Sequence, residues 1–141
     1  MYYLFKKRIK IGLISDELTY RALNANDIGV HNVSSQFNLN ILKLLNIQFI
    51  LVESAWRGHK DQWRYKIANY PGYPERSNVE LRKLLEIADK YNIPAVFWNK
   101  EDGAHFNRFI DSASLFKYIL TVDENCIERY QSILGKSVKV G

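Results

Sequence analysis

Short apolar runs alternate along this chain with segments in which apolar residues recur every three or four positions. The apolar runs predict buried strands, because strands of a parallel sheet are apolar on both faces. These runs lie at residues 9–15, 48–52, 94–98 and 118–122, and residues 137–140 could begin a fifth strand.

Helical spacing predicts four helices between or after these strands. A capping-box pattern, Ser77 followed by Glu80, marks the start of the second helix, and Asp123 precedes the last. The apolar positions are Phe37, Ile41, Leu44 and Leu45 within residues 33–45; Leu81, Leu84, Leu85, Ala88 and Tyr91; Phe106, Phe109, Ile110 and Ala113; and Cys126, Ile127 and Tyr130.

Two segments lack this regularity. Residues 18–31 have no clean period and include Gly29, so they are predicted to form a long loop or a broken helix. Residues 57–77 are polar, aromatic and rich in turn residues, and they predict a second long loop. Long loops in compact domains are often functional.

Alternating strands and helices predict an α/β fold with right-handed crossovers. We expect a Rossmann-like, doubly wound, mainly parallel sheet of about five strands, with helices on both faces. The length of 141 residues fits a single domain, and the hydrophobic content of 47% argues against disorder. A sequence that stops near the start of a strand is typical of a piece of a longer protein.

Cysteine content and the start of the chain bear on its location. A lone Cys126 precludes an internal disulfide and suits a reducing compartment. At the N-terminus the apolar residues precede the basic ones, the reverse of a signal peptide, and no apolar run approaches the roughly 20 residues of a membrane span. We expect a cytoplasmic protein, and peripheral contact with the inner face of the membrane stays open.

The net charge is +5, and basic residues cluster in two places. Such clusters suit anionic lipid surfaces, phosphates or acidic sugars, or they form a solvated basic face. Nucleic acid is not an expected partner, because no nucleic-acid-binding motif accompanies the charge. The clusters are Lys6, Lys7, Arg8 and Lys10, and Arg57, Lys60, Arg64 and Lys66.

The most informative stretch is residues 95–102, Ala-Val-Phe-Trp-Asn-Lys-Glu-Asp. Its first half reads as an apolar strand, and its second half supplies an amide, an amine and two carboxylates. Ligands of open α/β sheets bind beyond the carboxyl ends of the strands, so these ends predict a site. The residues expected to gather there are Asp16, Glu53, Trp56, Trp98, Asn99, Glu101, Asp102, Asp123 and Glu124.

These residue types suit sugar chemistry. Carboxylates can orient a hydroxyl group, or act as general bases when burial or a like charge raises their pKa. Tryptophan faces pack against the apolar C–H faces of sugar rings. Asp16, Asp123 and Glu124 could instead cap helices or hold loops. The pair at residues 101–102 favours a functional role, and His105 could move a proton or hydrogen-bond a hydroxyl.

Several common phosphate sites are missing from the sequence. No G-x-G-x-x-G or P-loop follows the first strand, which disfavours an independent NAD- or ATP-binding domain. A two-component receiver domain needs an acceptor Asp at the end of the third strand, where this chain has Trp98 and Asn99. Asp16, Glu53 and Asp102 could form a metal site, since hard cations bind carboxylates.

Several motifs within roughly residues 9–134 occur together in this chain. They are residues 52–58 (Val-Glu-Ser-Ala-Trp-Arg-Gly), Trp63, residues 93–102, His105, Phe106, Phe109, Ile110, Ala113, residues 121–127 and Tyr130. In these motifs the chain resembles the N-terminal domain of CgeB-like glycosyltransferases, the spore-maturation type. Two positions depart from that pattern: Gly103 stands where Pro is frequent, and Lys117 where an Asp often precedes the fourth strand.

This resemblance implies a GT-B architecture, in which two Rossmann-like domains face each other across a cleft. The C-terminal domain would hold the nucleotide-sugar donor, and the N-terminal domain would hold the saccharide acceptor. Residues 1–141 would then be the acceptor-side half and would be inactive alone. GT-B enzymes generally need no bound metal, so neither a metal nor a cofactor is expected on this chain.

In such an enzyme Glu101, Asp102 and His105 would lie at the sugar-transfer centre. One carboxylate would contact or deprotonate the acceptor hydroxyl, and His105 would hydrogen-bond a sugar hydroxyl near the reacting carbon. The acceptor pocket would be lined by Asp16, Glu53, Trp56, Trp98, Asn99 and Lys100.

Two other functions are compatible with the sequence. One is a non-catalytic carbohydrate-binding or assembly module that keeps the same half-fold. The other is a small metal-dependent hydrolase that uses the carboxylate cluster. A second α/β domain of roughly 150 or more residues after Gly141 in the natural gene would favour the enzyme over the module.

Overall fold

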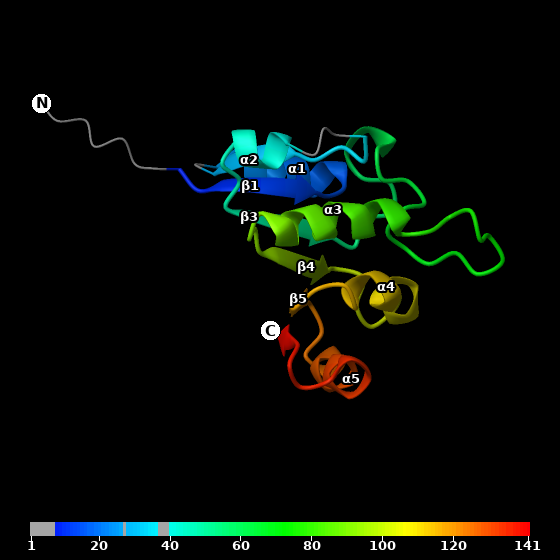
Figure 1. Cartoon of the computed structure of the whole chain (residues 1–141). Helices are drawn as coiled ribbons and strands as arrows, with labels where there is room; N and C mark the ends of the chain where they lie inside the picture. The colour runs from blue at the N-terminus through cyan, green and yellow to red at the C-terminus, as the bar shows by residue number, and fades with distance from the viewer. Residues whose placement is uncertain (1–7, 27, 37–39) are drawn as a thin grey trace, which may run out of the picture.

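The computed structural model describes residues 8–26, 28–36 and 40–141; Lys6, Lys7 and Phe37, which the sequence patterns include, lie outside these ranges. The described chain is an α/β fold in which helices flank one all-parallel, six-stranded sheet of order β2-β1-β3-β4-β5-β6 (Figure 1). The strands are β1 (Lys10–Ile14), β2 (Gly29–Asn32), β3 (Phe49–Glu53), β4 (Ala95–Asn99), β5 (Tyr118–Thr121) and β6 (Lys139–Val140). The helices are α1 (Glu17–Asn24), α2 (Ile41–Leu44), α3 (Val79–Lys90), α4 (Phe106–Ala113), α5 (Asn125–Leu134) and the short 3-10 helix η1 (His59–Asp61).

The predicted Rossmann-like, doubly wound fold class is confirmed. The strands expected from apolar runs are β1, β3, β4, β5 and β6, each within one or two residues of its predicted bounds. Every neighbouring pair in the sheet is parallel. All the strands therefore end at the same edge, as the sequence predicts.

The prediction of a long loop or broken helix for residues 18–31 is wrong, because α1 and β2 occupy most of this segment. The inward side of α1 carries a buried Thr19, whereas Leu18 is 77% exposed, so no apolar period marks the helix. β2 is a four-residue edge strand that contains His31 and Asn32, so it lacks an apolar run. The sheet consequently has six strands rather than about five.

Two helix predictions also need correction. In the described part of residues 33–45, only Ile41–Leu44 is helical. The capping box does not form: α3 begins after Asn78, and no side chain caps its start. The Nδ2 group of Asn78 instead donates to Ser112 Oγ at 3.1 Å, which ties α3 to α4.

One face of the sheet forms the hydrophobic core. Val52, Phe97 and Ile119 are paired in register across β3, β4 and β5, and none is more than 1% exposed. Right-handed crossovers place α2 to α5 on this face, and core residues such as Phe109 of α4 and Tyr130 of α5 belong to the same buried cluster. This packing fixes where α4 and α5 begin, at the carboxyl edge of the sheet.

The opposite face is only partly covered. The crossover from β1 to β2 runs in the other direction along the sheet, so it places α1 on this face, where Leu13 is fully buried. Farther along the face, Trp98 pairs with Leu120 and Val96 pairs with Tyr118. Tyr118 is 42% exposed and Leu120 is 44% exposed, so this part of the face is open to solvent.

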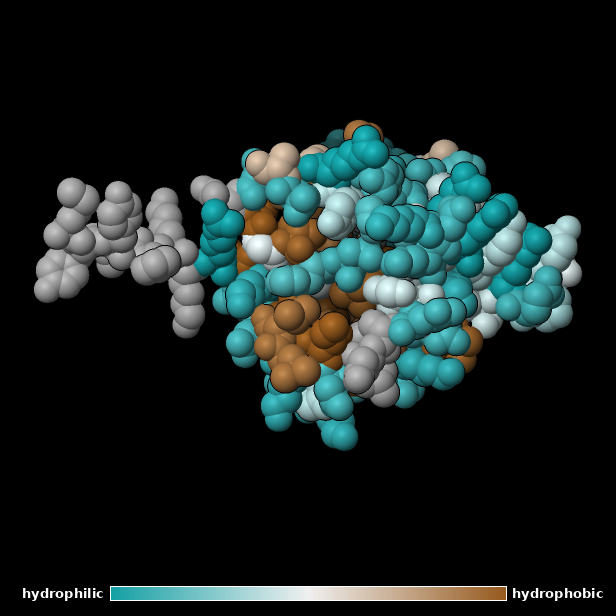
Figure 2. All heavy atoms as spheres, turned by 90° about the horizontal axis from the view of Figure 1, so that it is seen from above, coloured by the Kyte–Doolittle hydropathy of each residue, from teal (hydrophilic) through white to brown (hydrophobic). Residues whose placement is uncertain are grey.

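None of the described helices is long and apolar enough to cross a bilayer. The longest, α3, has 12 residues, whereas a membrane span needs roughly 20. Seen from the side of α1 and α2, the surface is largely hydrophilic, with apolar side chains gathered toward one end (Figure 2). This distribution fits helices that bury one face against a sheet and leave the other in water.

The long loop between β3 and α3 is anchored by Trp63. The indole is 1% exposed, and its Nε1 donates to the carbonyl of Val33, just beyond β2, at 2.6 Å. Gly58 passes beside it with φ +73°, and a Cβ atom at Gly58 would lie 2.8 Å from the Trp63 Cβ. The loop is thus packed on the domain at a point where only glycine fits.

We expect Gly58→Ala to lower the free energy of unfolding more than Gly72→Ala does. Both glycines have positive φ, which costs an alanine about 1–2 kcal/mol, but a Cβ at Gly72 meets nothing within 4 Å. The collision with Trp63 should add about 1–3 kcal/mol for Gly58→Ala. Urea unfolding of both variants measures the difference, and equal losses would contradict the packing described above.

Candidate functional site

Strand order reverses between β1 and β3, and open α/β sheets bind ligands at such a switch point. Asp16 follows β1, and Glu53 is the last residue of β3. In Figure 1 the strand arrows point toward the long loop and α4, which border this edge. The predicted site residues therefore do lie at one edge, and their contacts divide them into three groups.

The first group surrounds Glu53, whose side chain is buried. One carboxylate oxygen accepts the backbone N–H of Asp16 at 3.0 Å. The other accepts the Thr19 hydroxyl at 3.0 Å and lies 2.7 Å from the Lys100 Nζ. Lys100 also donates to the Thr19 hydroxyl at 2.9 Å and lies 5.3 Å from the centre of the Trp98 ring. Glu53 thus joins β1, α1 and the end of β4 and keeps little capacity for a ligand.

Asp16 holds the start of the long loop rather than capping α1 through its side chain. Its carboxylate accepts the backbone N–H groups of Gly58 at 2.8 Å and of Arg57 and Trp56 at 3.3 Å. These bonds fix the turn that carries the Trp56 side chain. Of the roles that the sequence allows for Asp16, holding a loop is the one that matches its contacts.

The second group is built around Asp102. Its carboxylate accepts hydrogen bonds from Asn99 Nδ2 at 2.8 Å, from the Tyr130 hydroxyl at 2.8 Å and from the Thr121 hydroxyl at 2.5 Å. Asn99 is fully buried, and its Nδ2 also donates to the Tyr130 hydroxyl at 2.8 Å. Both Asp102 oxygens are therefore engaged inside the protein, where they tie β4, β5 and α5 together.

Burial raises the pKa of the Asp102 carboxyl above its ordinary value, although the hydrogen bonds from Thr121 and Tyr130 act in the opposite direction. Burial likewise raises the pKa of the Tyr130 hydroxyl, so that it stays protonated and can donate. A neutral donor facing a partly buried carboxylate is a stable arrangement. The Asp102 group is therefore structural, and it holds the ends of β4 and β5 against α5.

Asp123 lies one residue before the N-cap position of α5, which is Glu124, so the predicted capping position is wrong by one residue. Its Oδ1 accepts the backbone N–H of Asn125 at 3.0 Å and the Asn125 Nδ2 at 2.9 Å. Glu124 is exposed and occupies the position before the helix, without a capping bond from its own side chain. Neither the Asp123 nor the Glu124 side chain forms a hydrogen bond with Trp56, Glu101 or His105.

The third group is open to solvent and consists of Trp56, Glu101 and His105. The His105 ring meets the Trp56 ring edge to face, with centroids 5.3 Å apart. The His105 Nε2 lies 3.9 Å from a Glu101 carboxylate oxygen, and the two side chains are 47% and 33% exposed. Within the described parts of the chain, the Glu101 carboxylate has this one ion-pair contact and accepts no side-chain hydrogen bond. Glu101 is thus the acidic group of residues 101–102 that remains available to a ligand.

An open pocket of about 660 Å³ lies beside Trp56. Asp16 and Trp56 line it, together with residues of the turn at Arg57 and Gly58 and the start of α1 at Glu17. A pocket of this size can hold a saccharide unit or two, since ligand sites commonly measure about 300–1,000 Å³. Of the predicted site residues, Asp16 and Trp56 therefore border this cavity, whereas Glu101 and His105 are not part of its lining.

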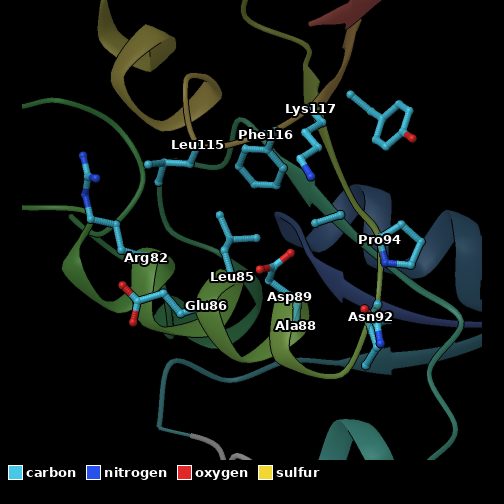
Figure 3. A pocket seen from close by; sticks show the side chains of 13 residues that line it. Arg82, Leu85, Glu86, Ala88, Asp89, Asn92, Pro94, Leu115, Phe116 and Lys117 are labelled. Atoms are coloured by element: carbon cyan, nitrogen blue, oxygen red, sulfur yellow. The ribbon is translucent and has the colours of Figure 1, made fainter. Parts of the chain in front are cut away.

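A larger pocket, of about 750 Å³, lies at the opposite, amino-terminal edge of the sheet (Figure 3). Residues from the end of α3 and from the segment before β5 line it, including Leu85, Phe116 and Lys117. None of the predicted site residues reaches it. Its position at the amino ends of the strands is unusual for a ligand site in this fold, so we place the candidate chemistry at Trp56.

Several contributing residues were not identified from the sequence. Thr19 lies in a segment whose sequence predicts a loop, and Arg108 and Tyr70, which pack near Trp56, carry no motif. The helical spacing predicts Tyr130 only as a core residue. Its hydroxyl was the available signal, because a tyrosine at a buried position needs a polar partner where a phenylalanine does not.

The carboxylates do not form a metal site in the part of the chain that the structure describes. No three His, Cys, Asp or Glu side chains there lie close enough together to bind one ion. Asp16, Glu53 and Asp102, the expected ligands of the hydrolase alternative, each bond to different protein groups. The geometry therefore gives this alternative no support.

Comparison with known proteins identifies no relative. No family model matches the chain, and neither a curated protein nor a solved structure is detectably similar to it. The geometry of the edge and the resemblance of its motifs are therefore what any functional proposal must rest on.

We expect Lys100→Met to lower the free energy of unfolding by about 3 kcal/mol, because it leaves the buried Glu53 carboxylate without its counter-charge. The double variant Glu53→Gln/Lys100→Met should recover more than half of that loss. Urea unfolding of the single and double variants measures both effects. A single variant within about 0.5 kcal/mol of wild type would show that the pair does not hold the edge.

The raised pKa of Asp102 predicts a pH effect with a definite sign. The folded chain binds this proton more tightly than the unfolded chain, so Asp102 adds stability below its unfolded pKa and loses it as the pH rises through the folded value. Relative to Asp102→Asn, wild type should therefore lose unfolding free energy between about pH 3 and pH 6. A relative gain over this range would mean that the hydrogen bonds outweigh burial.

Proposed function

We propose that this chain is the acceptor-side domain of a glycosyltransferase, which moves a sugar from a nucleotide-sugar donor to a saccharide acceptor. The resemblance to CgeB-like enzymes suggests this activity, and the arrangement at the switch-point edge supports it. Trp56 lines a pocket of saccharide size and packs against His105, which in turn lies 3.9 Å from the Glu101 carboxylate.

The observation that carries the proposal is the different state of the carboxylates at one edge. Asp16, Glu53 and Asp102 each accept hydrogen bonds from protein groups, whereas the Glu101 carboxylate has a loose ion-pair contact with His105 at 3.9 Å. Internally bonded carboxylates build a frame, and an available one can accept a proton. We therefore narrow the proposed reacting groups to Glu101 and His105, with Asp102 positioning their loop.

In the proposed reaction, the acceptor hydroxyl oxygen forms a bond to the anomeric carbon of the donor sugar. The bond from that carbon to the nucleoside diphosphate breaks, and the diphosphate takes the electron pair. Glu101 receives the proton of the acceptor hydroxyl, and His105 donates a hydrogen bond to a neighbouring sugar hydroxyl. Trp56 supplies apolar surface for the sugar ring. The donor is held by a second domain, so this chain binds acceptor without turnover.

The alternative function, a non-catalytic carbohydrate-binding module, would use the same Trp56 surface. The two functions differ in the role of Glu101. A module needs Glu101 only for binding, whereas an enzyme needs it for the proton. The two functions therefore separate when binding and turnover are measured on the same variant.

We expect tetrasaccharides, neutral or acidic, to shift the Trp56 indole NMR signal of this chain. The buried Trp63 indole serves as an internal reference, because it is 1% exposed. Trp56→Ala should weaken binding, measured by calorimetry, at least tenfold, because it removes the indole surface on which the sugar ring packs. Uridine diphosphate alone should leave the Trp56 signal nearly unchanged. Absence of any saccharide shift at Trp56 would contradict the proposal.

In the intact natural enzyme, Glu101→Gln should lower turnover about 10²–10⁴-fold and leave the KM for the acceptor nearly unchanged, as expected for loss of a general base. Glu86→Gln is the matched control, because Glu86 is an exposed glutamate on α3 that lines the pocket at the opposite edge. Unchanged turnover in Glu101→Gln, with saccharide binding intact, would favour the binding module.

A further inference from the structure

The long loop carries most of the excess positive charge of the chain. Residues 57–77 contain five Lys or Arg and two Asp or Glu, against a net charge of +5 for the whole sequence. Tyr65, Tyr70 and Tyr73 lie in the same segment. Arginine side chains pack against these rings, so charge and aromatic surface coincide.

Arg76 lies among the three tyrosine rings. Its Cζ is 3.9 Å from the centre of the Tyr65 ring, 4.1 Å from that of Tyr73 and 5.3 Å from that of Tyr70. Tyr65 has φ +64°, a left-handed conformation that bulky residues rarely adopt. Such strain persists where the surroundings impose it, and it is concentrated at functional sites. The loop therefore holds Arg76 in a defined position.

Arg108 continues this surface toward Trp56. Its Cζ lies 5.0 Å from the Tyr70 ring centre and 5.1 Å from the Trp56 ring centre. Its Nε donates to the Asn69 carbonyl at 2.6 Å, and the Asn69 N–H donates back to the Arg108 carbonyl at 2.6 Å. Trp56, Arg108, Tyr70 and Arg76 thus form one continuous strip, which we call the arginine–aromatic surface.

The charge on this surface is poorly compensated. Among residues 8–26, 28–36 and 40–141, no carboxylate forms an ion pair with Arg108, and the pairing of Arg76 with Glu75 is loose, at 3.9 Å with Glu75 67% exposed. A guanidinium stacked on a ring keeps N–H groups at its edge for a planar oxyanion. Bidentate bonds from such an edge suit a carboxylate or a phosphate group.

The surface adjoins the proposed transfer centre. Arg108 lies three residues after His105 at the start of α4, so both side chains meet the Trp56 ring. A saccharide that reaches Glu101 beside Trp56 would pass its next units over Arg108 and Arg76. A pocket of about 430 Å³ is lined by Tyr70, Tyr73 and Arg76, and also by Arg82 and Asp111.

We propose that Arg108 and Arg76 bind an anionic group on the acceptor, so that the acceptor is an acidic saccharide that carries carboxylate or phosphate. This inference rests on the proposed function, since it names the substrate of the same site. The tyrosine rings pack on the sugar faces, and the two guanidinium groups select the charge. A neutral saccharide makes the aromatic contacts alone and binds more weakly.

Binding of four probes to the whole chain tests this inference, with dissociation constants taken from the Trp56 indole signal. The probes are a hyaluronan tetrasaccharide, its carboxyl-reduced neutral form, mannose 6-phosphate and uridine diphosphate. The acidic tetrasaccharide should bind at least tenfold more tightly than its neutral form. Arg108→Gln and Arg76→Gln should each remove most of that preference, and Arg21→Gln, which removes an equal charge from α1, should leave it intact. Tighter binding of mannose 6-phosphate than of the hyaluronan tetrasaccharide would identify phosphate as the preferred anion.

The outcomes separate this inference from the function on which it rests. Equal binding of the acidic and neutral tetrasaccharides at Trp56 would overturn the inference and leave the acceptor domain standing. Equal losses in Arg21→Gln and Arg108→Gln would overturn it as well, because the preference would then follow net charge. Arg108-dependent binding of uridine diphosphate as tight as that of the acidic sugar would overturn it by assigning the arginines to the donor. Silence of Trp56 toward all saccharides would overturn both proposals.

Discussion

The Glu53 carboxylate joins three elements of the chain. It accepts hydrogen bonds from Asp16 after β1 and from Thr19 of α1, and it forms an ion pair with Lys100 after β4. A buried carboxylate is costly unless such partners satisfy it, so the position of one partner constrains the others. Asp16 in turn fixes the turn that bears Trp56. The whole carboxyl edge is thereby assembled around one acidic group.

The polar residues of this edge are of two kinds: some are bonded inside the protein and others are exposed to solvent. Glu53 and Asp102 lie on either side of β4, and each is surrounded by donors, so their charge serves the frame. Glu101 and His105 project from the loop that follows, where the frame holds their backbone but does not consume their side chains. Proteins commonly position reactive groups in this way, on loops carried by a rigid scaffold.

Much of the fold could be predicted because β3, β4 and β5 are short apolar runs, and β1 is apolar apart from its first residue and Gly12. α1 and β2 could not, since Thr19 replaces an apolar residue on the inner side of the helix and His31 lies in a short edge strand. Contacts with the rest of the fold determine α1 and β2, and neither segment has a local hydrophobic period that would predict it.

The strand ends in the sequence predict that the candidate site residues lie at one edge of the sheet. They do not predict which contacts each residue makes there. Residues 101–102 looked equivalent as neighbouring carboxylates, and the structure separates them because Thr121 and Tyr130 approach one of the two. Those partners lie 19 and 28 positions further along the chain, so no local pattern announces them. The contact of Arg108 with Tyr70 is likewise a product of folding.

The long loop is joined to the core at Trp63, while Tyr73 is half exposed and Arg76 lies outside the buried cluster. Substitutions at those outer positions would change the exposed surface of the loop without disturbing the sheet or the bonds of Asp16. Inherited variation can therefore alter this outer surface while the hydrogen-bonded edge of the sheet is passed on unaltered.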